Sequence, residues 1–448
     1  LHRIGMDDLN NLVQPYLTSE DLKVRLASLD AFEINSDGDI RTVIGRMDDP
    51  SEEVFLPAKA KIQTAEYQNP QILVESLNIP RRKIRDGIFE LLETLNIKNL
   101  DIFRFARSQV ELCYNHVAEI DALTRLPDTR ERDLLVDHLE NSKQIQLENI
   151  LRVLATEDRS GEMRLIWRGL FSSDARRRSN SLEALDGSLN ASLSKILLPL
   201  FEGIPLADLL RTGRQHFKLA AFDGDRKALY SYFLEKDDWV TVVLTLYLIE
   251  KQGMEGVDFG FLQPLLKSQN RFVSQMATRA IHAKPHGTVE LEEEMEAQIS
   301  IPDKILRLKS INIFEGLSVS ELAAVASVTE EIDQPAGETV IKEGESGESM
   351  YLIISGEVSV IKDAGETGRE EIELARIGAG DYFGEMALFE DAVRSATIRT
   401  AEESRFLILH KQEFTEIVRE YPQIALHICK ALSERLRSLH AKVQGLDK

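Results

Sequence analysis

The spacing of apolar residues changes once along this 448-residue chain, and that change limits what the chain can fold into. Over residues 1–285 apolar side chains recur at helical spacing with short polar breaks, which predicts an all-helical region. From about Gln334 β-branched residues recur at every second position, and glycines separate the short runs. We therefore expect a multidomain fold, in which an all-α helical solenoid precedes a β-roll (jelly roll) with flanking helices.

A repeat of 30 residues is visible near the start of the chain. The segment Leu17–Arg25 aligns with Met47–Val54 and with Leu77–Arg85, at an offset of 30 residues each time. Each copy ends one helix with Leu or Met, turns through polar residues or proline, and begins the next helix with an inward-facing β-branched residue. Stacked hairpins of this kind would form a solenoid with a concave surface that can bind a protein partner. These copies resemble HEAT repeats.

Three regions follow from these patterns. Residues 1–285 are expected to form the helical repeat domain, and residues 303–448 the β-roll with its flanking helices. Residues 286–302 are rich in glutamate and predict an acidic linker or a solvated helix. Ser318 lies three residues before Glu321, which is the spacing of a capping box and predicts a helix from Val319. The expected strands include residues 339–341, 351–354, 358–361 and 406–409, and helical spacing returns over residues 412–443.

The segment Phe383–Thr397 carries the strongest chemical signal. Gly384 allows another group to approach the backbone closely, and residues 385–388 predict a short helical turn whose N–H groups can face an anion. Arg394 can add a guanidinium to the same phosphate through charge-assisted hydrogen bonds. The carboxylate of Glu385 can accept a hydrogen bond from a ribose 2′-hydroxyl. The segment therefore predicts a ribose phosphate as ligand.

Three motifs in order, Gly344–Gly347, Tyr351–Gly356 and Gly384–Thr397, resemble the cyclic nucleotide-binding domain family. The resemblance runs from about Ile305 to Leu439. It implies that Glu385 binds the ribose hydroxyl and that Arg394 binds the cyclic phosphate. The remaining residues that it implies at the site are Gly384, Met386, Ala387, Ser395, Ala396 and Thr397.

Two departures from the family pattern affect the expected ligand. Val393 stands where many members have proline. This difference affects the rigidity of the loop but not its charge. Ser395 follows the arginine, where alanine or threonine is common, and leaves the identity of the base open. We expect cAMP as the ligand, with cGMP as the alternative. No metal and no further cofactor are expected.

Other patterns have a simpler structural interpretation. Cys113 and His116 have a ligand-like spacing, but no second pair is near in the sequence, which favours a packed core pair. The segment Asn35–Asp39 misplaces the glycine of a calcium loop and favours a repeat turn. The glycines of residues 378–384 have the wrong spacing for a dinucleotide loop. No nucleophile elbow, P-loop or zinc-protease motif is found, so we do not expect an enzyme.

Arginines gather at two predicted repeat turns. One group is Arg176–Arg178, and the other consists of Arg81, Arg82 and Arg85. Both groups could bind an acidic partner, but a solvated turn is the favoured interpretation.

The net charge limits which partners the protein can bind, and the cysteines indicate in which cellular compartment it functions. The chain has 54 Lys and Arg against 75 Asp and Glu, a net charge of −21, which disfavours nucleic acid as a partner. Cys113 and Cys429 cannot form a disulfide framework, which favours a reducing compartment. The longest apolar stretch, Trp239–Ile249, is too short to span a membrane. We expect a cytoplasmic location, with the cytoplasmic face of the inner membrane as the alternative.

Three functions remain open. The favoured one is a sensor in which a cyclic nucleotide allosterically regulates a helical-repeat module that binds a protein partner. The alternative is the soluble regulatory tail of a membrane transporter, because the order of domains resembles the C-terminal part of some bacterial nucleotide (ATP/ADP) transporter-like proteins. Leu1 as first residue fits such a piece of a longer chain. A transcription regulator is disfavoured, because it needs a helix-turn-helix after the last helix and only Gln444–Lys448 remain there.

Overall fold

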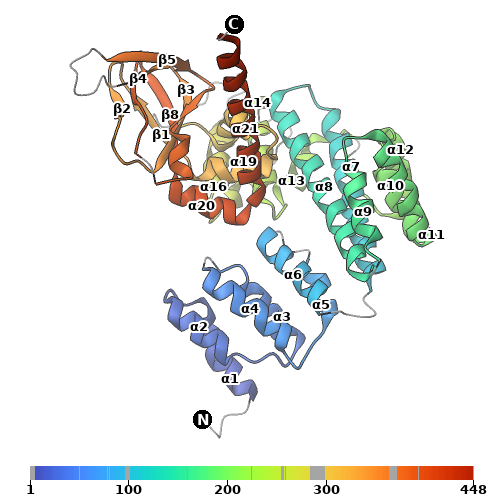
Figure 1. Ribbon diagram of the computed structural model, residues 1–448. Helices are drawn as coiled ribbons and strands as arrows, with labels where there is room; N and C mark the ends of the chain where they lie inside the picture. The colour runs from blue at the N-terminus through green and yellow to red at the C-terminus, as the bar shows by residue number, and fades with distance from the viewer. Residues whose placement is uncertain are drawn as a thin grey trace. The chain divides into compact units, whose positions relative to one another are not determined.

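The computed structural model gives the chain as two compact units, which are described separately (Figure 1). Unit 1 comprises Leu1–Ala122 and Ser142–Ala221, and unit 2 comprises Leu123–Asn141 and Phe222–Lys448. The structure describes residues 6–49, 51–77, 79, 81–95, 101–158, 160–222, 224–253, 257, 259–282, 298–362, 371–391 and 393–446.

Unit 1 is helical throughout its described residues. Its elements are α1 (Met6–Val13), η1 (Gln14–Thr18), α2 (Leu22–Ala31), α3 (Asp37–Arg46), α4 (Glu52–Thr64), α5 (Pro70–Ser76), α6 (Arg82–Thr94), most of α7 (Ile102–Thr124), the second half of α8 (Arg130–Glu157), α9 (Glu162–Leu170), α10 (Ala175–Ser188), α11 (Ala191–Leu197), η2 (Leu198–Leu200) and α12 (Leu206–His216).

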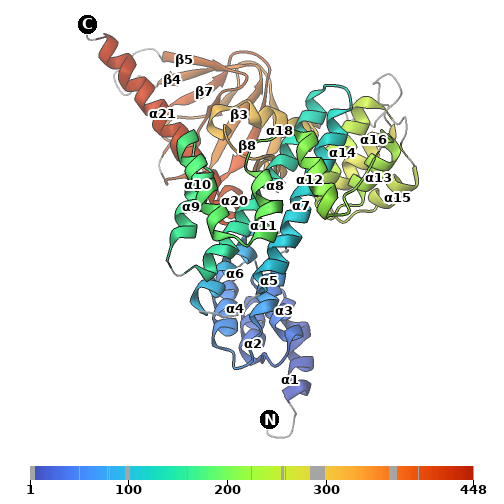
Figure 2. The same cartoon turned by 90° about the vertical axis from the view of Figure 1, so that its right-hand side faces the viewer.

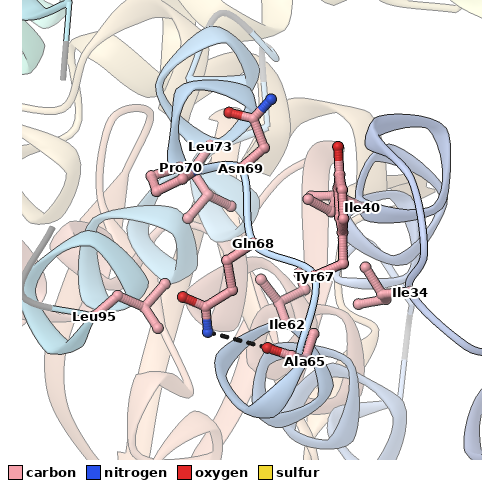
Figure 3. A pocket seen from close by; sticks show the side chains of 10 residues that line it. All are labelled: Ile34, Ile40, Ile62, Ala65, Tyr67, Gln68, Asn69, Pro70, Leu73 and Leu95. Atoms are coloured by element: carbon pink, nitrogen blue, oxygen red, sulfur yellow. Dashed lines mark hydrogen bonds between the residues drawn. The ribbon is translucent and has the colours of Figure 1, made fainter. Parts of the chain in front are cut away.

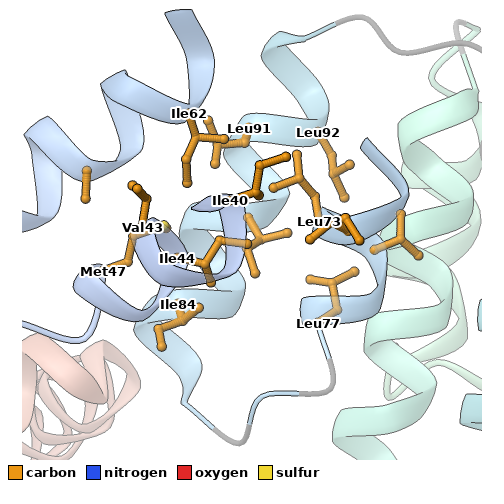
Figure 4. Packing of buried hydrophobic residues seen from close by; sticks show 14 of the residues in the cluster. Ile40, Val43, Ile44, Met47, Ile62, Leu73, Leu77, Ile84, Leu91 and Leu92 are labelled. Atoms are coloured by element: carbon orange, nitrogen blue, oxygen red, sulfur yellow. The ribbon is translucent and has the colours of Figure 1, made fainter. Parts of the chain in front are cut away.

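The 30-residue repeat sets the positions of the first helices. Helices α2, α4 and α6 begin at Leu22, Glu52 and Arg82, which are 30 residues apart. The apolar residues that end the preceding helices, Leu17, Met47 and Leu77, are all buried. They join a core to which successive helices contribute, and Figure 4 shows part of it between α3 and α6. The predicted helical hairpins are confirmed here, and the HEAT resemblance stays a prediction.

Arginines near the helix starts tie several turns together. In each case the guanidinium donates a hydrogen bond to the carbonyl oxygen six residues earlier, across the turn that precedes the helix. The pairs are Arg25 and Ser19 (2.8 Å), Arg85 and Ile79 (3.1 Å), Arg132 and Leu126 (3.3 Å), and Arg178 and Ser172 (2.6 Å). Two of the arginines that the sequence offered to an acidic partner, Arg85 and Arg178, therefore take part in holding their own turns.

Unit 2 begins with helices and ends with a β-sandwich. Its helical elements before the sandwich are the first half of α8, α13 (Arg226–Leu234), α14 (Trp239–Gln252), α15 (Phe259–Leu265), α16 (Arg271–His282), α18 (Ile301–Lys309), η3 (Asn312–Phe314) and α19 (Val319–Val328). Helix α14 is buried from Val240 to Glu250 because its sequence is apolar on nearly all sides. The predicted capping box of Ser318 and Glu321 begins α19.

The sandwich consists of two antiparallel sheets of four strands each (Figures 1 and 2). The strands are β1 (Glu330–Gln334), β2 (Thr339–Ile341), β3 (Ser349–Ser355), β4 (Glu357–Lys362), β5 (Ile372–Gly378), β6 (Tyr382–Phe383), β7 (Thr397–Thr400) and β8 (Ser404–His410). One sheet has the order β1-β8-β3-β6 and the other β2-β7-β4-β5. Both sheets contribute to a core that includes Ile341, Ile353 and Phe406. Helices α20 (Lys411–Glu420) and α21 (Pro422–Leu446) close the unit.

The predicted fold class is confirmed, since an all-helical region precedes a β-sandwich with flanking helices. The boundaries expected at residues 285 and 303 remain predictions, because the glutamates at 290–296 lie outside the described residues. By contacts, α13 to α16 group with the sandwich and not with the first helices. None of the helices described in the structure is long and apolar enough to cross a membrane.

We predict that the Arg25 turn contributes measurably to the stability of unit 1. Arg25 forms an ion pair with Asp49 at 2.8 Å, and its side chain is only 14% exposed. Arg25→Ala leaves the Asp49 carboxylate buried without its cation, so the free energy of unfolding should fall by on the order of 2–3 kcal/mol. Arg41→Ala is the matched control, because Arg41 pairs with Glu75 at 51% exposure and should lose less than about 1 kcal/mol. Equal losses in urea titrations of the two variants would contradict this role.

Candidate functional site

A left-handed glycine and a short helical turn form part of the candidate site. Strand β6 ends at Phe383, and Gly384 follows with φ of 76°, a conformation that favours glycine. The turn η5 covers Glu385–Leu388, at the bounds predicted from the sequence. A Cβ atom at position 384 would lie 2.7 Å from Nη1 of Arg394 and 3.0 Å from the carbonyl oxygen of Ser349. The close approach of these groups therefore requires glycine.

Arg394 lies against Gly384, and the turn between β2 and β3 holds its backbone. Its N–H donates to the carbonyl oxygen of Glu345 at 2.8 Å, and its own carbonyl oxygen accepts from the N–H of Gly344 at 2.9 Å. Its guanidinium donates to the carbonyl oxygen of Gly384 at 3.3 Å. A Cβ atom at position 347 would lie 2.1 Å from Nε of Arg394, so Gly347 provides the space for this side chain.

The charge on Arg394 is incompletely compensated. The side chain is half-buried, and this burial lowers the pKa of its guanidinium, although Tyr351 acts in the opposite direction. Arginine still remains protonated at neutral pH. No carboxylate among the described residues pairs with it, whereas Arg376, Arg399 and Arg405 of the same sandwich all form ion pairs with acidic residues. The site thus holds a half-buried cation that an anion would stabilise.

The other residues implied by the resemblance take different positions around this pair. Glu385 is partly buried, and Met386 is 53% exposed. Ser395 is exposed, and its carbonyl oxygen accepts from Nζ of Lys362 at 3.0 Å. Ala387 is buried within η5, Ala396 is partly buried, and Thr397 is buried at the start of β7, where its Oγ1 accepts from the N–H of Glu343 at 3.0 Å. Of the eight residues, the structure brings Gly384 and Arg394 into direct contact.

The structure adds residues to which the sequence analysis gave no role. Gly347 and Glu345 position Arg394, and Lys362 holds the Ser395 backbone while it pairs with Glu343. Tyr351 stacks on Phe383 beside the turn, with 5.1 Å between ring centroids. The motif Gly344–Gly347 was visible in the sequence, but Gly347 contacts a residue 47 positions later because β2 pairs with β7 and the segments that continue these strands meet.

The loop between η5 and β7 also contacts the helix that follows the sandwich. Oδ1 of Asp391 forms an ion pair with Nζ of Lys411 on α20, at 2.5 Å. The ring of Phe389 meets that of Phe414 edge to face, with 5.6 Å between centroids. Ala392 lies outside the described residues. We call residues 383–397 the cassette, and its outer loop is thus bound to α20.

The weaker candidate sites have structural roles. Cys113 is fully buried and its burial raises the pKa of the thiol to about 12, while His116 bonds to Glu119 at 2.8 Å. Ser36 caps α3 at the turn that was compared with a calcium loop. Among the described residues no three His, Cys, Asp or Glu side chains gather as a metal site would require.

A small hollow in unit 1 contains none of the predicted site residues (Figure 3). It is lined mainly by apolar side chains, among them Ile34, Ile40 and Leu73. Its polar edge is Tyr67, whose hydroxyl donates to Asp37 at 3.0 Å. These contacts tie neighbouring repeat turns together, so the hollow is a packing feature of the repeats.

Comparison with known proteins agrees with this geometry. Residues 332–421 match the family described as "Cyclic nucleotide-binding domain". The chain therefore carries a cyclic nucleotide-binding domain in its C-terminal part, preceded by a large helical region.

Relatives of known function match about 30% of this chain. The "CRP-like cAMP-activated global transcriptional regulator" of Mycobacterium tuberculosis is 33% identical over 139 residues, which are 31% of this chain and 61% of that protein. The "Cyclic AMP receptor protein" of Thermus thermophilus is 30% identical over 130 residues, which are 29% of this chain and 59% of that protein. The crystal structure of Thermus thermophilus Catabolite Activator Protein is 29% identical at a TM-score of 0.28, and the match covers 30% of this chain and 63% of that chain. The chain thus spans less than two thirds of each of these proteins.

We predict that Gly347→Ala weakens anion binding without unfolding the domain. The new methyl group would displace the flexible end of Arg394, so nucleotide affinity should fall roughly tenfold or more. The thermal midpoint should change little, because position 347 needs no left-handed conformation. Gly378→Ala is the matched control, since its Cβ would meet only an ordinary contact at 3.7 Å. If both variants bind nucleotide equally well in calorimetry, Gly347 does not position Arg394.

Proposed function

We propose that this chain senses a cyclic purine nucleotide through its C-terminal domain and regulates its helical part by that binding. The ligand is cAMP, with cGMP as the alternative, and it is bound without being turned over. The observation that carries this proposal is the half-buried Arg394, which lacks a carboxylate partner among the described residues and faces the left-handed Gly384. A cyclic phosphate has a single negative charge, which one guanidinium can balance.

Two further features support a nucleotide over a simple anion. Glu385 follows Gly384 directly, so its carboxylate can accept a hydrogen bond from a ribose hydroxyl while the phosphate meets Arg394. Met386 and Phe389 are 53% and 43% exposed on the same cassette, and such apolar side chains can pack against a purine. Relatives of this domain carry cAMP in their names, which supports cAMP as the first ligand to test.

The helical part is proposed to bind a protein partner. Its hairpins stack in sequence, and chains built in this way offer extended surfaces to other proteins. The net charge of −21 opposes an interaction with nucleic acid backbones.

Arg394→Ala tests the site directly. Loss of the guanidinium leaves the bound phosphate without its charged partner, which should cost on the order of 2–3 kcal/mol and weaken cAMP binding roughly 30-fold to 150-fold. Arg376→Ala removes an exposed arginine of the same sandwich and should bind as the wild type does. Calorimetry that detects no binding of cAMP or cGMP to the wild type would refute the proposal, as would chromatography that shows the nucleotide consumed.

Glu385→Ala tests the role of the ribose. We expect a smaller loss of cAMP affinity than in Arg394→Ala, because the ligand group left without a partner is a neutral hydroxyl and not a charged phosphate. The wild type should bind 2′-deoxy-cAMP more weakly than cAMP, and this difference should shrink in the variant. If the affinities for cAMP and 2′-deoxy-cAMP differ by the same factor in both proteins, Glu385 does not bind the ribose hydroxyl.

A further inference from the structure

Within unit 2 a buried histidine joins three helices. His138 of α8 is 2% exposed, and its Nε2 lies 2.6 Å from Oδ2 of Asp238, the residue that caps α14. The other ring nitrogen, Nδ1, lies 3.3 Å from Oγ of Ser320 on α19. Desolvation alone would raise the pKa of Asp238, but the hydrogen bonds from His138 and Thr241 outweigh it and hold that pKa well below its usual range. Asp238 is therefore an ionised acceptor for His138.

A second contact joins α14 to α18, the first helix before the sandwich. Tyr247 is buried on α14, and its hydroxyl donates to Oδ1 of Asp303 at 2.5 Å. The other oxygen of Asp303 accepts from Oγ of Ser300 at 2.6 Å. Lys309 at the end of α18 also pairs with Asp137, the neighbour of His138. Helices α8 and α14 therefore hold both α18 and α19 through these polar contacts.

These two helices are connected to the cassette by packing. Helix α19 packs against α20, and α18 packs against α19. Helix α20 in turn holds the outer loop of the cassette through Lys411 and Phe414. A contiguous line of contacts thus runs from the cassette through α20 and α19 to α8, as energetic coupling between distant sites requires.

Apolar side chains of the cassette and of α21 are in contact with solvent. Met386 and Phe389 of the cassette are 53% and 43% exposed, and Leu426 of α21 is 62% exposed. An arrangement that encloses a purine would bury apolar side chains of this kind. We call the arrangement in which Met386 and Phe389 are exposed the open arrangement, and the contacts of His138 and Tyr247 are present in it.

We propose that α8 and α14 are the receiving surface of the nucleotide sensor, and that their docking on α18 and α19 favours the open arrangement. This inference rests on the proposed function. It adds the place at which the signal leaves the cyclic nucleotide-binding domain. Coupling is reciprocal: if nucleotide weakens this docking, weaker docking must strengthen nucleotide binding by the same factor. Helix α8 belongs to both units, with its residues to Asn141 in unit 2 and from Ser142 in unit 1, so this part of the receiving surface continues as a helix into unit 1.

The experiment compares cAMP affinity in variants of the full chain that lie outside the cassette. Tyr247→Phe removes the hydroxyl that binds Asp303 and keeps the ring, and Ser320→Ala removes the hydroxyl that faces His138. Loss of one hydrogen bond should tighten cAMP binding by about twofold to tenfold in calorimetry. The matched control is Tyr230→Phe, because Tyr230 is equally buried in unit 2 but its hydroxyl binds Gln252 of α14, away from α18.

The outcomes separate this inference from the function on which it rests. Tighter binding in Tyr247→Phe and Ser320→Ala, with Tyr230→Phe like the wild type, supports the coupling. Unchanged or weaker affinity in both variants overturns it while cAMP binding by the wild type still stands. Amide exchange adds a second readout, since cAMP should speed exchange at the start of α18 in the wild type. A wild type that binds no cyclic nucleotide would refute the proposed function itself.

Discussion

A guanidinium held half-buried without a carboxylate beside it is the constraint around which the C-terminal domain is built. Removing a charge from water is unfavourable unless a partner replaces the lost hydration. Among the described residues the guanidinium of Arg394 has one acceptor, the carbonyl oxygen of Gly384, and its remaining donors can bind another acceptor. The strands and turns around it hold the arginine in place, through the backbone of residues 344–345 and the space at Gly347.

The other arginines of the chain show how different that arrangement is. At the repeat turns, Arg25 binds both a carboxylate and two backbone carbonyls, so its donors are largely used within the fold. On the surface of the sandwich, Arg376 and Arg399 pair with exposed glutamates, and such pairs contribute little to stability. Among the described residues Arg394 has no carboxylate partner, either buried or exposed. The chemistry of this one side chain, and not the number of arginines, therefore points to an anionic ligand.

Local features of this fold could be predicted from the sequence. The 30-residue offset gave the spacing of the starts of α2, α4 and α6, and the capping box gave the start of α19. The turn at Glu385–Leu388 was also predicted at its bounds, because glycine and turn residues act through neighbouring backbone. Strands β1, β5, β6 and β7 were not among the strands named from the sequence; β1 has one apolar residue and β6 has only two residues, so neither carries an alternating apolar pattern.

Contacts between distant residues could not be predicted in this way. His138 forms a hydrogen bond with Asp238, one hundred positions later. Tyr247 forms one with Asp303, and nothing in the sequence between these two residues indicates that contact. The same holds for Gly347, whose role appears only when the pairing of β2 with β7 brings Arg394 beside it. In α21, whose helical spacing the sequence predicted, Ile424 and Ile428 are fully buried, whereas the side chains of Leu436 and Leu439 lie outside the described residues.

The most direct test of the account observes the guanidinium of Arg394 itself. Its Nε–H signal can be followed by nuclear magnetic resonance in the full chain and assigned by its absence in Arg394→Lys. The account predicts that saturating cAMP shifts this signal and slows its exchange with water, because the phosphate becomes a hydrogen-bond acceptor for the guanidinium. A signal that stays unchanged while cAMP is bound elsewhere on the protein would contradict the central claim that Arg394 is the partner of the phosphate.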